Sequence, residues 1–390
     1  MSTPTTSDLG AGITVEALEA DPFPIYARLR EEAPVCFVPA VGLHLVTRWE
    51  DVQHVATHPE TFTAAVGSSP LTRTLGQNVL TVDGADHARM RAGMDAPMRP
   101  RAVEAYAPEV IAPIAARHLD AIAGGDGGEL MAAYCEPVSV LALGAVMGLG
   151  ELDADTLRRW FADLATGGAN FEQDPAKQAV ADATSAEIDE RVGPILDRLA
   201  REPDESVLAH MLAADSSRAE VLSNLKLILL GGMQEPGHAL GICVWAFLTH
   251  PDALARVRAD AGLIRPAVEE ALRWHSPVGT QTRQVTQPVT LAGVRLVPGD
   301  TIAAVLASAN RDGRHWDRPD EFVIDRRGAH AAFGLGSHHC AGAPFARHEV
   351  RIPLEMLLAR LPRLRLDPDH DVELRGWEFR APTALHVRWD

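Results

Sequence analysis

The chain of 390 residues carries a net charge of −17, and 46% of its residues are hydrophobic. The negative charge argues against nucleic acid and anionic membranes as partners. The hydrophobic fraction is enough for a large core, and no linker, charge block or repeat divides the sequence, so we expect one domain over residues 1–390. Cys36, Cys135, Cys243 and Cys340 lack the spacing of a disulfide framework, which indicates a reducing compartment.

The first residues of the chain are polar. Met1 to Asp8 contain no basic region followed by an apolar stretch. We therefore expect no signal peptide and no membrane anchor. Together with the reducing compartment that the cysteines indicate, this predicts a cytoplasmic protein.

Helical periodicity dominates the rest of the sequence. Apolar residues recur at helical spacing over residues 102–124, 129–148, 153–166, 176–201, 218–249, 262–275 and 343–361. They alternate, as in strands, over residues 35–47, 283–296, 301–307 and 383–389. The sequence therefore predicts a mainly α fold with small β-sheets.

A glycine-rich loop is the most informative segment. Residues 333–342 read Phe-Gly-Leu-Gly-Ser-His-His-Cys-Ala-Gly and precede an apolar helix expected from about Ala343. Glycines let the backbone approach closely and point its amides at a sulfur atom, and the start of a helix adds a favourable dipole. Both effects favour the thiolate of Cys340, which is the form that binds a metal. We expect Cys340 to be the ligand of a haem iron, with Phe333 sheltering the iron–sulfur bond from water.

Two other roles for Cys340 remain open. An isolated cysteine in a tight turn is usually a buried structural thiol. His338, His339 and Cys340 could also bind zinc, although three adjacent residues cannot readily reach one tetrahedral ion and no second ligand pair lies at finger spacing.

The loop resembles the cysteine-ligand loop of the cytochrome P450 family, because every fixed position of the pattern Phe-x-x-Gly-x-x-x-Cys-x-Gly is present. The resemblance implies the P450 fold, in which one haem (heme b) lies between a long central helix and the helix that follows the cysteine loop. It also implies a soluble monooxygenase of the bacterial type, which uses O2 and electrons from ferredoxin and ferredoxin reductase. Phe333, Gly334 and Gly342 would then surround the Cys340 thiolate.

Two further segments match the family in order and spacing. Glu270-Ala-Leu-Arg273 matches its Glu-x-x-Arg helix motif, and Phe322-Val-Ile-Asp-Arg326 matches the segment that adds a second arginine. Residues three apart share a helix face, and a carboxylate between two guanidiniums can form a charge-assisted network. We expect Glu270, Arg273 and Arg326 to brace the cysteine loop.

Four residues match positions at which the family holds the haem carboxylates. They are His87, Arg91, Arg283 and His338. Two propionates buried beside a protein core need cationic or hydrogen-bonding partners. The alternative for each residue, taken singly, is a solvated surface charge.

The central helix departs from the family pattern. Relatives place Gly-Gly or Ala-Gly, a variable residue, and then an acid and a threonine that relay protons, whereas here Gly231-Gly232-Met233 is followed by Gln234 and Glu235. Glutamine cannot donate a proton as an acid does. A carboxylate at position 235 could take a proton from hydrogen peroxide and return it to the leaving oxygen. We therefore expect Gln234 and Glu235 to be the catalytic residues and the enzyme to be a peroxygenase as well as a monooxygenase.

Two other roles for Glu235 remain open. It could bind a cationic or hydroxylated substrate, or it could satisfy backbone groups freed where Pro236 and Gly237 break the helix. His238 could face the pocket, but a histidine one turn past a kink is more often a hydrogen-bonded core residue.

Substrate contacts are expected from the segments that the resemblance places over the haem. They contribute a mostly apolar set: Phe62, Val66, Leu71, Leu75, Met233, Val278 and Phe379. An apolar pocket with few polar groups suits a small hydrophobic or aromatic molecule. The Gly-Gly-Met-Gln-Glu-Pro stretch is similar to that of enzymes acting on lignin-type phenols, which favours O-demethylation of a methoxyaromatic with release of formaldehyde. Hydroxylation of a terpenoid, fatty acid or polyketide is the alternative.

Electrons would have to come from a partner, because the sequence contains no flavin or iron–sulfur motif. A basic patch that steers an acidic ferredoxin could form from Arg89, Arg99, Arg101, Arg347 and Arg351. Ordinary surface arginines are the alternative. The competing function from another class is a haem protein that only binds gas or transfers electrons. Such an electron carrier would want a second protein ligand on the iron, for which His238 is the candidate.

Overall fold

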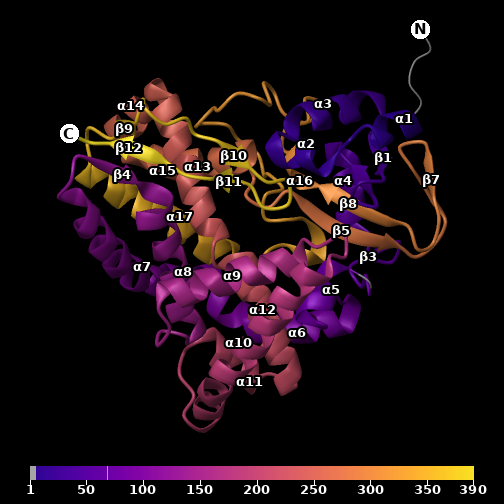
Figure 1. Cartoon of the computed structure of the whole chain (residues 1–390), viewed down its shortest axis with the longest axis horizontal. Helices are drawn as coiled ribbons and strands as arrows, with labels where there is room; N and C mark the ends of the chain where they lie inside the picture. Colours follow the sequence, from indigo (N-terminus) through magenta and orange to yellow (C-terminus); the bar gives the residue numbers. More distant parts are fainter. Residues whose placement is uncertain (1–5, 68) are drawn as a thin grey trace. The chain divides into compact units, whose positions relative to one another are not determined.

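The computed structural model describes residues 6–67 and 69–390. Residues 1–5 lie outside this description. They are part of the segment on which the expectation of no signal peptide depends. The chain forms two compact units (Figure 1). Unit 1 comprises residues 1–66, 269–340 and 374–381, and unit 2 comprises residues 67–268, 341–373 and 382–390. A single domain over residues 1–390 stays a prediction.

Unit 1 is built on a mixed five-stranded sheet. Its strands, in spatial order, are β1 (Val35–Val38), β2 (Leu43–Val46), β8 (Thr301–Val305), β5 (Thr280–Val285) and β3 (Phe62–Thr63). β2 and β8 run parallel, and the other neighbours are antiparallel. Branched and aromatic side chains from β1, β3, β5 and β8 form the core with residues of α4, as expected of strands that bury one face.

The remaining elements of unit 1 are short. They are α1 (Thr6–Ala11), α2 (Val15–Ala20), α3 (Phe23–Glu32), α4 (Trp49–Thr57), the hairpin of β6 (Val289–Leu291) and β7 (Val294–Leu296), α16 (Leu306–Ala309), the 3-10 turn η3 (Gly336–His338), β10 (Leu374–Arg375) and β11 (Ala381–Pro382), which ends at the first residue of unit 2. The helix α15 (Ile264–Trp274) ends within unit 1.

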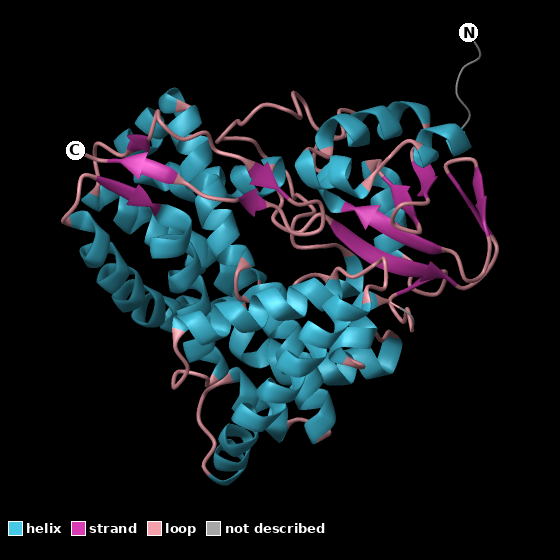
Figure 2. Ribbon diagram, in the orientation of Figure 1, coloured by secondary structure: helices cyan, strands magenta, loops and turns pink. Residues whose placement is uncertain are grey.

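Unit 2 is mainly helical (Figure 2). Its helices are α5 (Pro70–Leu75), α6 (Gly84–Met98), α7 (Pro100–Ala123), the π-helix η1 (Met131–Cys135), α8 (Glu136–Met147), α9 (Ala154–Gly168), α10 (Pro175–Arg201), α11 (Val207–Ala213), α12 (Arg218–Gly232), α13 (Glu235–Thr249), α14 (Pro251–Ala259), the 3-10 turn η2 (Ala261–Leu263) and α17 (Ala343–Arg360). A small sheet of β4 (Gly127–Glu129), β12 (His386–Arg388) and β9 (Arg365–Leu366) completes it. The expectation of a mainly α protein with small β-sheets is confirmed.

The prediction of one continuous central helix over residues 218–249 is wrong. The segment is divided into α12 and α13, and Met233 and Gln234 lie between them. Pro236 lacks an amide hydrogen and its ring clashes with the carbonyl one turn earlier, which stops the α-helical hydrogen bonds there. The hydroxyl of Ser139 donates to the carbonyl oxygen of Met233 at 2.6 Å and satisfies one of the freed groups.

Smaller corrections apply at the ends of other segments. The helix expected over residues 129–148 begins with the last residue of β4 and a π-helical turn, and only residues 136–147 are α-helical. The strand expected over residues 301–307 ends at Val305, where α16 begins. Periodicity also missed α3, α4, α11 and α14, because short helices give few repeats to count. It missed the longer α6 as well, whose apolar residues do not form a single stripe in the sequence. Within the described residues, no helix is both long enough and apolar enough to cross a membrane.

A buried ionic network holds the end of α15 in unit 1. The guanidinium of Arg273 donates to both carboxylate oxygens of Glu270, at 2.7 and 2.9 Å. Arg326 donates from Nε to the same carboxylate at 3.0 Å, and the amide of Val323 donates at 2.8 Å. The side chains of Glu270 and Arg273 are 2% and 1% exposed. Removing one member of such a network would leave an uncompensated buried charge.

We expect Glu270→Ala to lower the free energy of unfolding by about 3–5 kcal/mol, because two guanidiniums would lose their carboxylate. Chemical denaturation followed by circular dichroism measures this change. The matched control is Glu321→Ala, which removes an exposed carboxylate 3.0 Å from Arg318 and should cost less than about 1 kcal/mol. Equal effects of the two substitutions would contradict the proposed role of the network.

Candidate active site

The loop that carries Cys340 is a tight turn in unit 1. The amide of Cys340 donates to the carbonyl of Phe333 at 2.8 Å, which closes the loop. Gly334 and Gly336 have φ of 72° and 71°. A Cβ atom on Gly336 would lie 2.1 Å from the carbonyl oxygen of Ala56. Glycine is therefore required at both positions, by conformation and, at Gly336, by space.

Gly342 differs from the other two glycines of the motif. It precedes α17 with φ of −79°, which any residue can adopt. The predicted start of the following helix at Ala343 is confirmed. The backbone of the structure does not show why position 342 should be glycine.

The environment of Cys340 separates it from the other cysteines. Cys36, Cys135 and Cys243 are buried, whereas Cys340 is partly exposed. This partial exposure does not fit a buried structural thiol. In the part of the chain that the structure describes, no group of three or more His, Cys, Asp or Glu side chains is placed to hold a metal ion, which argues against a zinc site at His338, His339 and Cys340.

The ionic network reaches the start of this loop through one asparagine. Arg273 donates to the carbonyl oxygen of Asn310 at 2.7 Å. The side-chain oxygen of Asn310 accepts from the amide of Ala331 at 2.7 Å, and the carbonyl of Ala331 accepts from the amide of Gly334 at 2.8 Å. These bonds connect Glu270 to the cysteine loop, in the way that a bracing role requires.

The four expected haem-carboxylate partners fall into two pairs. His87 and Arg91 lie one turn apart on α6 in unit 2, and Arg91 also pairs with Asp95 at 2.5 Å. Arg283 on β5 and His338 in η3 belong to unit 1 and are 6% and 4% exposed. His87 is 7% exposed, so three of these four residues are buried. Their burial does not fit solvated surface charges. Their cationic and imidazole groups suit buried carboxylates.

Glu235 is the first residue of α13, and its carboxyl group is buried. The side chain is 7% exposed, and neither carboxyl oxygen accepts a hydrogen bond from a described residue. Desolvation raises its pKa to about 8. The backbone amides of Glu235 and Gln234 oppose this shift, so the role of satisfying backbone groups at the helix break stays open.

A second buried carboxyl group lies near Glu235, and sequence reasoning missed it. Glu349 on α17 is 2% exposed, and its pKa is raised well above the usual range by desolvation and then by the charge of Glu235. Two neighbouring carboxyls in a poorly solvated place disfavour each other's ionisation. The signal in the sequence was an acidic residue within the apolar helix that follows the cysteine, nine residues after Cys340.

The side chains of Gln234 and His238 lie near Glu235 in the sequence, and each carries an atom without a hydrogen-bond partner among the described residues. These atoms are the amide oxygen of Gln234 and Nδ1 of His238. Desolvation lowers the pKa of His238 to about 4, so its ring is neutral. The ring meets Phe161 of α9 edge-on, with centroids 6.0 Å apart. His238 therefore lies in the apolar interior of unit 2, but without the hydrogen bond expected of a core histidine.

Open space lies beside the end of α12. A Cβ atom on Gly231 would meet nothing within 4 Å, although the neighbouring Leu230 and Met233 are 2% and 0% exposed. A bare backbone surface within an otherwise buried stretch suits the approach of a flat cofactor. Each unit therefore carries groups that suit a haem: the partly exposed thiol of Cys340 and the donors at positions 283 and 338 in unit 1, and this surface and the donors at positions 87 and 91 in unit 2.

The predicted substrate residues are only partly brought together. Val278 and Phe379 face each other in an antiparallel bridge in unit 1. Phe62 is fully buried in the core of the five-stranded sheet, where packing alone accounts for it. The others are the half-buried Leu71 and the buried Leu75 on α5, Met233 between α12 and α13, and Val66 at the end of unit 1.

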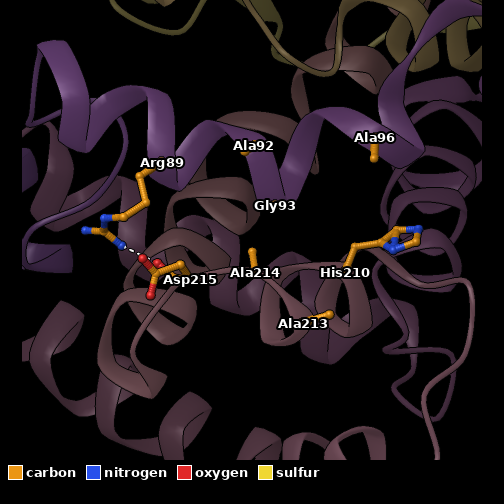
Figure 3. Close-up of a pocket in the computed structure, with 8 residues that line it drawn as sticks. All are labelled: Arg89, Ala92, Gly93, Ala96, His210, Ala213, Ala214 and Asp215. Atoms are coloured by element: carbon orange, nitrogen blue, oxygen red, sulfur yellow. Dashed lines mark hydrogen bonds between the residues drawn. The ribbon is translucent and has the colours of Figure 1, made fainter.

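Two of the five arginines of the expected basic patch, Arg89 and Arg351, form ion pairs. Arg89 donates to Glu220 at 2.6 Å and to the carbonyl of Asp215 at 2.6 Å. Figure 3 shows it turned toward Asp215, at the rim of a hollow between α6 and α11. The volume of this hollow is about 330 Å³. Arg351 pairs with Glu355 at 3.0 Å. Arg99 and Arg101 are exposed, and they are the arginines of the set best able to attract an acidic partner.

Comparisons with known proteins agree with this site. The family model described as Cytochrome P450 matches residues 178–375. Cytochrome P450 monooxygenase PikC of Streptomyces venezuelae is 33% identical, over 100% of this chain and 95% of its own length. The 6-deoxyerythronolide B hydroxylase of Saccharopolyspora erythraea is 30% identical, over 97% and 99%.

Solved structures show the same fold. P450BioI, in complex with an acyl carrier protein ligated to hexadec-9Z-enoic acid, superposes with a TM-score of 0.89 at 26% identity, over 96% of this chain and 100% of its own. The myxobacterial CYP267B1 in complex with myristic acid gives a TM-score of 0.87 at 28% identity, over 96% and 98%. The expectation from the cysteine loop is confirmed: the chain belongs to the cytochrome P450 family, the monooxygenases that bind haem through a cysteine thiolate.

Proposed function

We propose that this P450 oxidises the methoxy group of a small aromatic molecule and that it can use hydrogen peroxide through Glu235. The single observation that carries the peroxide route is the buried carboxyl of Glu235, which has no hydrogen-bond partner among the described residues and therefore remains available to a ligand. The resemblance of the segment around it to enzymes of lignin-type phenols supports the substrate class.

The haem, when bound, supplies the activation of oxygen. We assign Cys340 as its iron ligand, with Phe333 and Gly334 beside the thiolate and Gly342 before the next helix. His87, Arg91, Arg283 and His338 would hold its carboxylates by charge-assisted hydrogen bonds. Glu270, Arg273 and Arg326 would keep the cysteine loop in place, and the brace through Asn310 supports this assignment.

Glu235 would move the proton that the peroxide reaction requires. In its ionised form it takes a proton from one oxygen of hydrogen peroxide, and it then returns that proton to the other oxygen, which leaves as water. The remaining oxygen enters the methyl group, and the hemiacetal that forms breaks down to a phenol and formaldehyde. Gln234 cannot release a proton, but its amide can orient the peroxide or a water molecule.

The normal route would use O2 and electrons from ferredoxin and ferredoxin reductase. The exposed Arg99 and Arg101 support docking of an acidic partner. We also propose a cytoplasmic location and a single functional domain over residues 1–390.

A second candidate is hydroxylation of a larger aliphatic molecule. It is favoured by relatives named as hydroxylases of 6-deoxyerythronolide B and of a C-19 steroid. Similar structures in complex with myristic acid, or with an acyl carrier protein ligated to hexadec-9Z-enoic acid, also favour it. A haem protein without enzymatic activity is not proposed, because the relatives are named monooxygenases and hydroxylases.

We expect Cys340→Ser to abolish the carbon monoxide absorption band typical of thiolate-bound haem, because an alcohol does not replace the thiolate donor. The measurement is a reduced carbon monoxide difference spectrum of the purified protein. Cys36→Ser, which alters a buried thiol of the same unit, should keep the band. Retention of the band in the Cys340 variant would show that another residue binds the iron.

We expect Glu235→Gln to reduce formaldehyde release from a methoxyphenol and hydrogen peroxide by about 100-fold or more, since general acid–base catalysis contributes about that much. Glu235→Thr should do the same. The control is the reaction of each variant with ferredoxin, its reductase and a nicotinamide cofactor, with the haem content matched. Peroxide-driven rates that are equal in native protein and both variants would refute the role of Glu235.

The native peroxide reaction should also accelerate as the pH rises through about 8. Glu235 is mostly protonated at neutral pH because desolvation raises its pKa to about 8, and only the ionised form can accept a proton. Initial rates of formaldehyde release between pH 6.5 and 9 measure this dependence. The rise should be absent in Glu235→Gln, and a rate in the native protein that falls over this range would contradict the assignment.

A further inference from the structure

The turn that contains Phe379 carries a carboxyl group that the proposed function does not use. Glu378 precedes Phe379, and the turn packs on the start of β5. The amide of Gly279 donates to the carbonyl of Glu378 at 2.9 Å, and the amide of Arg380 donates to the carbonyl of Pro277 at 2.8 Å. These backbone bonds place Glu378 next to the bridge between Val278 and Phe379.

The two backbones approach so closely that no side chain fits between them. A Cβ atom on Gly279 would lie 1.8 Å from the carbonyl oxygen of Trp377. At the other side of the turn, the guanidinium of Arg380 donates to the carbonyl oxygens of Gly376 at 3.0 Å and Ala20 at 3.2 Å. The position of Glu378 is therefore fixed by its neighbours, and its carboxyl group is not needed to hold the turn.

A threonine on β5 holds the carboxyl group. The hydroxyl of Thr280 lies 2.9 and 2.8 Å from the two carboxyl oxygens of Glu378. A hydroxyl has one hydrogen to donate, whereas an ionised carboxylate has about four acceptor positions. No described cation forms an ion pair with Glu378, so most of its hydrogen-bonding capacity is unused. Such a group is expensive to desolvate unless a ligand or water completes its hydrogen bonds.

The surroundings of Glu378 are poorly solvated but not closed. Desolvation is the main reason that its pKa is raised to about 7, with the Thr280 bond opposing and the charge of Glu19 adding to the shift. Tyr26 and Arg380 are the other titratable groups nearby, and the Tyr26 hydroxyl is fully buried without a hydrogen-bond partner. Glu378, Val278 and Phe379 each keep part of their surface uncovered.

We propose that Glu378 is a substrate-binding residue that selects aromatic molecules carrying a hydroxyl group, and that Thr280 positions its carboxyl. The inference rests on the proposed function in one respect, the placement of Val278 and Phe379 in the substrate pocket. These apolar side chains would contact the ring, and the carboxyl would bind the hydroxyl. A hydroxyl can donate to the ionised carboxyl or accept from the protonated one, so it binds Glu378 in both states that are populated near neutral pH.

The test compares two probes of nearly the same shape, 3-methoxyphenol and 3-methoxytoluene. Their dissociation constants with the haem-loaded full chain are measured by absorbance titration of the haem. The native protein should bind the phenol about tenfold or more tightly, as a hydrogen bond to a charged group allows. Glu378→Leu should remove this preference, and Glu378→Gln should leave part of it because the amide oxygen still accepts.

The control is Glu321→Gln, which removes an exposed carboxylate of the same unit and should keep the native preference. An unchanged preference in Glu378→Leu would overturn the proposal. If that variant does not fold, Thr280→Val decides. A loss of at least about threefold in the preference of Thr280→Val for the phenol supports a positioning role for Thr280. An unchanged preference in this variant overturns the proposal.

Formaldehyde release from 3-methoxyphenol, measured on the same samples, separates this inference from the proposed function. A preference that depends on Glu378, without any formaldehyde from the native protein, would reject O-demethylation and keep the selection of hydroxylated ligands. Formaldehyde release by a native protein that binds both probes equally well would reject the role of Glu378 and keep the demethylase.

Discussion

The paired carboxylate of Glu270 is the constraint on which unit 1 depends. Its two oxygens accept hydrogen bonds from Arg273, Arg326 and the amide of Val323. The guanidiniums donate in turn to the carbonyls of Asn310, Pro319 and Glu321, so one charge organises three separate segments of chain. A buried ion is tolerable only when it is so completely paired. Asn310 connects this network to Ala331, close to the start of the cysteine loop.

The protein buries carboxyl groups in a second, opposite way. Glu235 and Glu349 in unit 2 form no ion pair with any cation of the described residues, and their raised pKa values favour neutralisation by a proton instead of an arginine. Glu378 is intermediate, because Thr280 supplies one hydrogen bond and no charge. A fully paired carboxylate has a structural role, whereas a carboxyl that is neutral near pH 7 can exchange its proton and has capacity left for a ligand.

Much of this arrangement could be predicted from the sequence. Long helices such as α7, α10 and α17 have enough periodic repeats to identify them, and the fixed spacing around Cys340 carries chemistry by itself. The break between α12 and α13 was signalled by Pro236 and Gly237, but the apolar spacing on both sides of it favoured one kinked helix over two separate ones. The pair of Glu378 and Thr280 could not be found, since the residues lie 98 positions apart. Only the folded backbone brings such residues together.

The crossing of α13 over the π-helix η1 has a consequence for engineering this enzyme. Cβ atoms on Gly237 and Gly241 would lie 2.8 Å from the carbonyl oxygen of Cys135 and 2.3 Å from the sulfur of Met131. At Gly241 the flexible Met131 side chain can move aside, whereas at Gly237 the close atom belongs to the backbone. Because Glu235 is the first residue of the same helix, a larger residue at Gly237 would displace its carboxyl along with the helix. Directed evolution for new substrates should therefore keep Gly237 constant, because a library member with a larger residue at this crossing would move the Glu235 carboxyl before it gained a substrate.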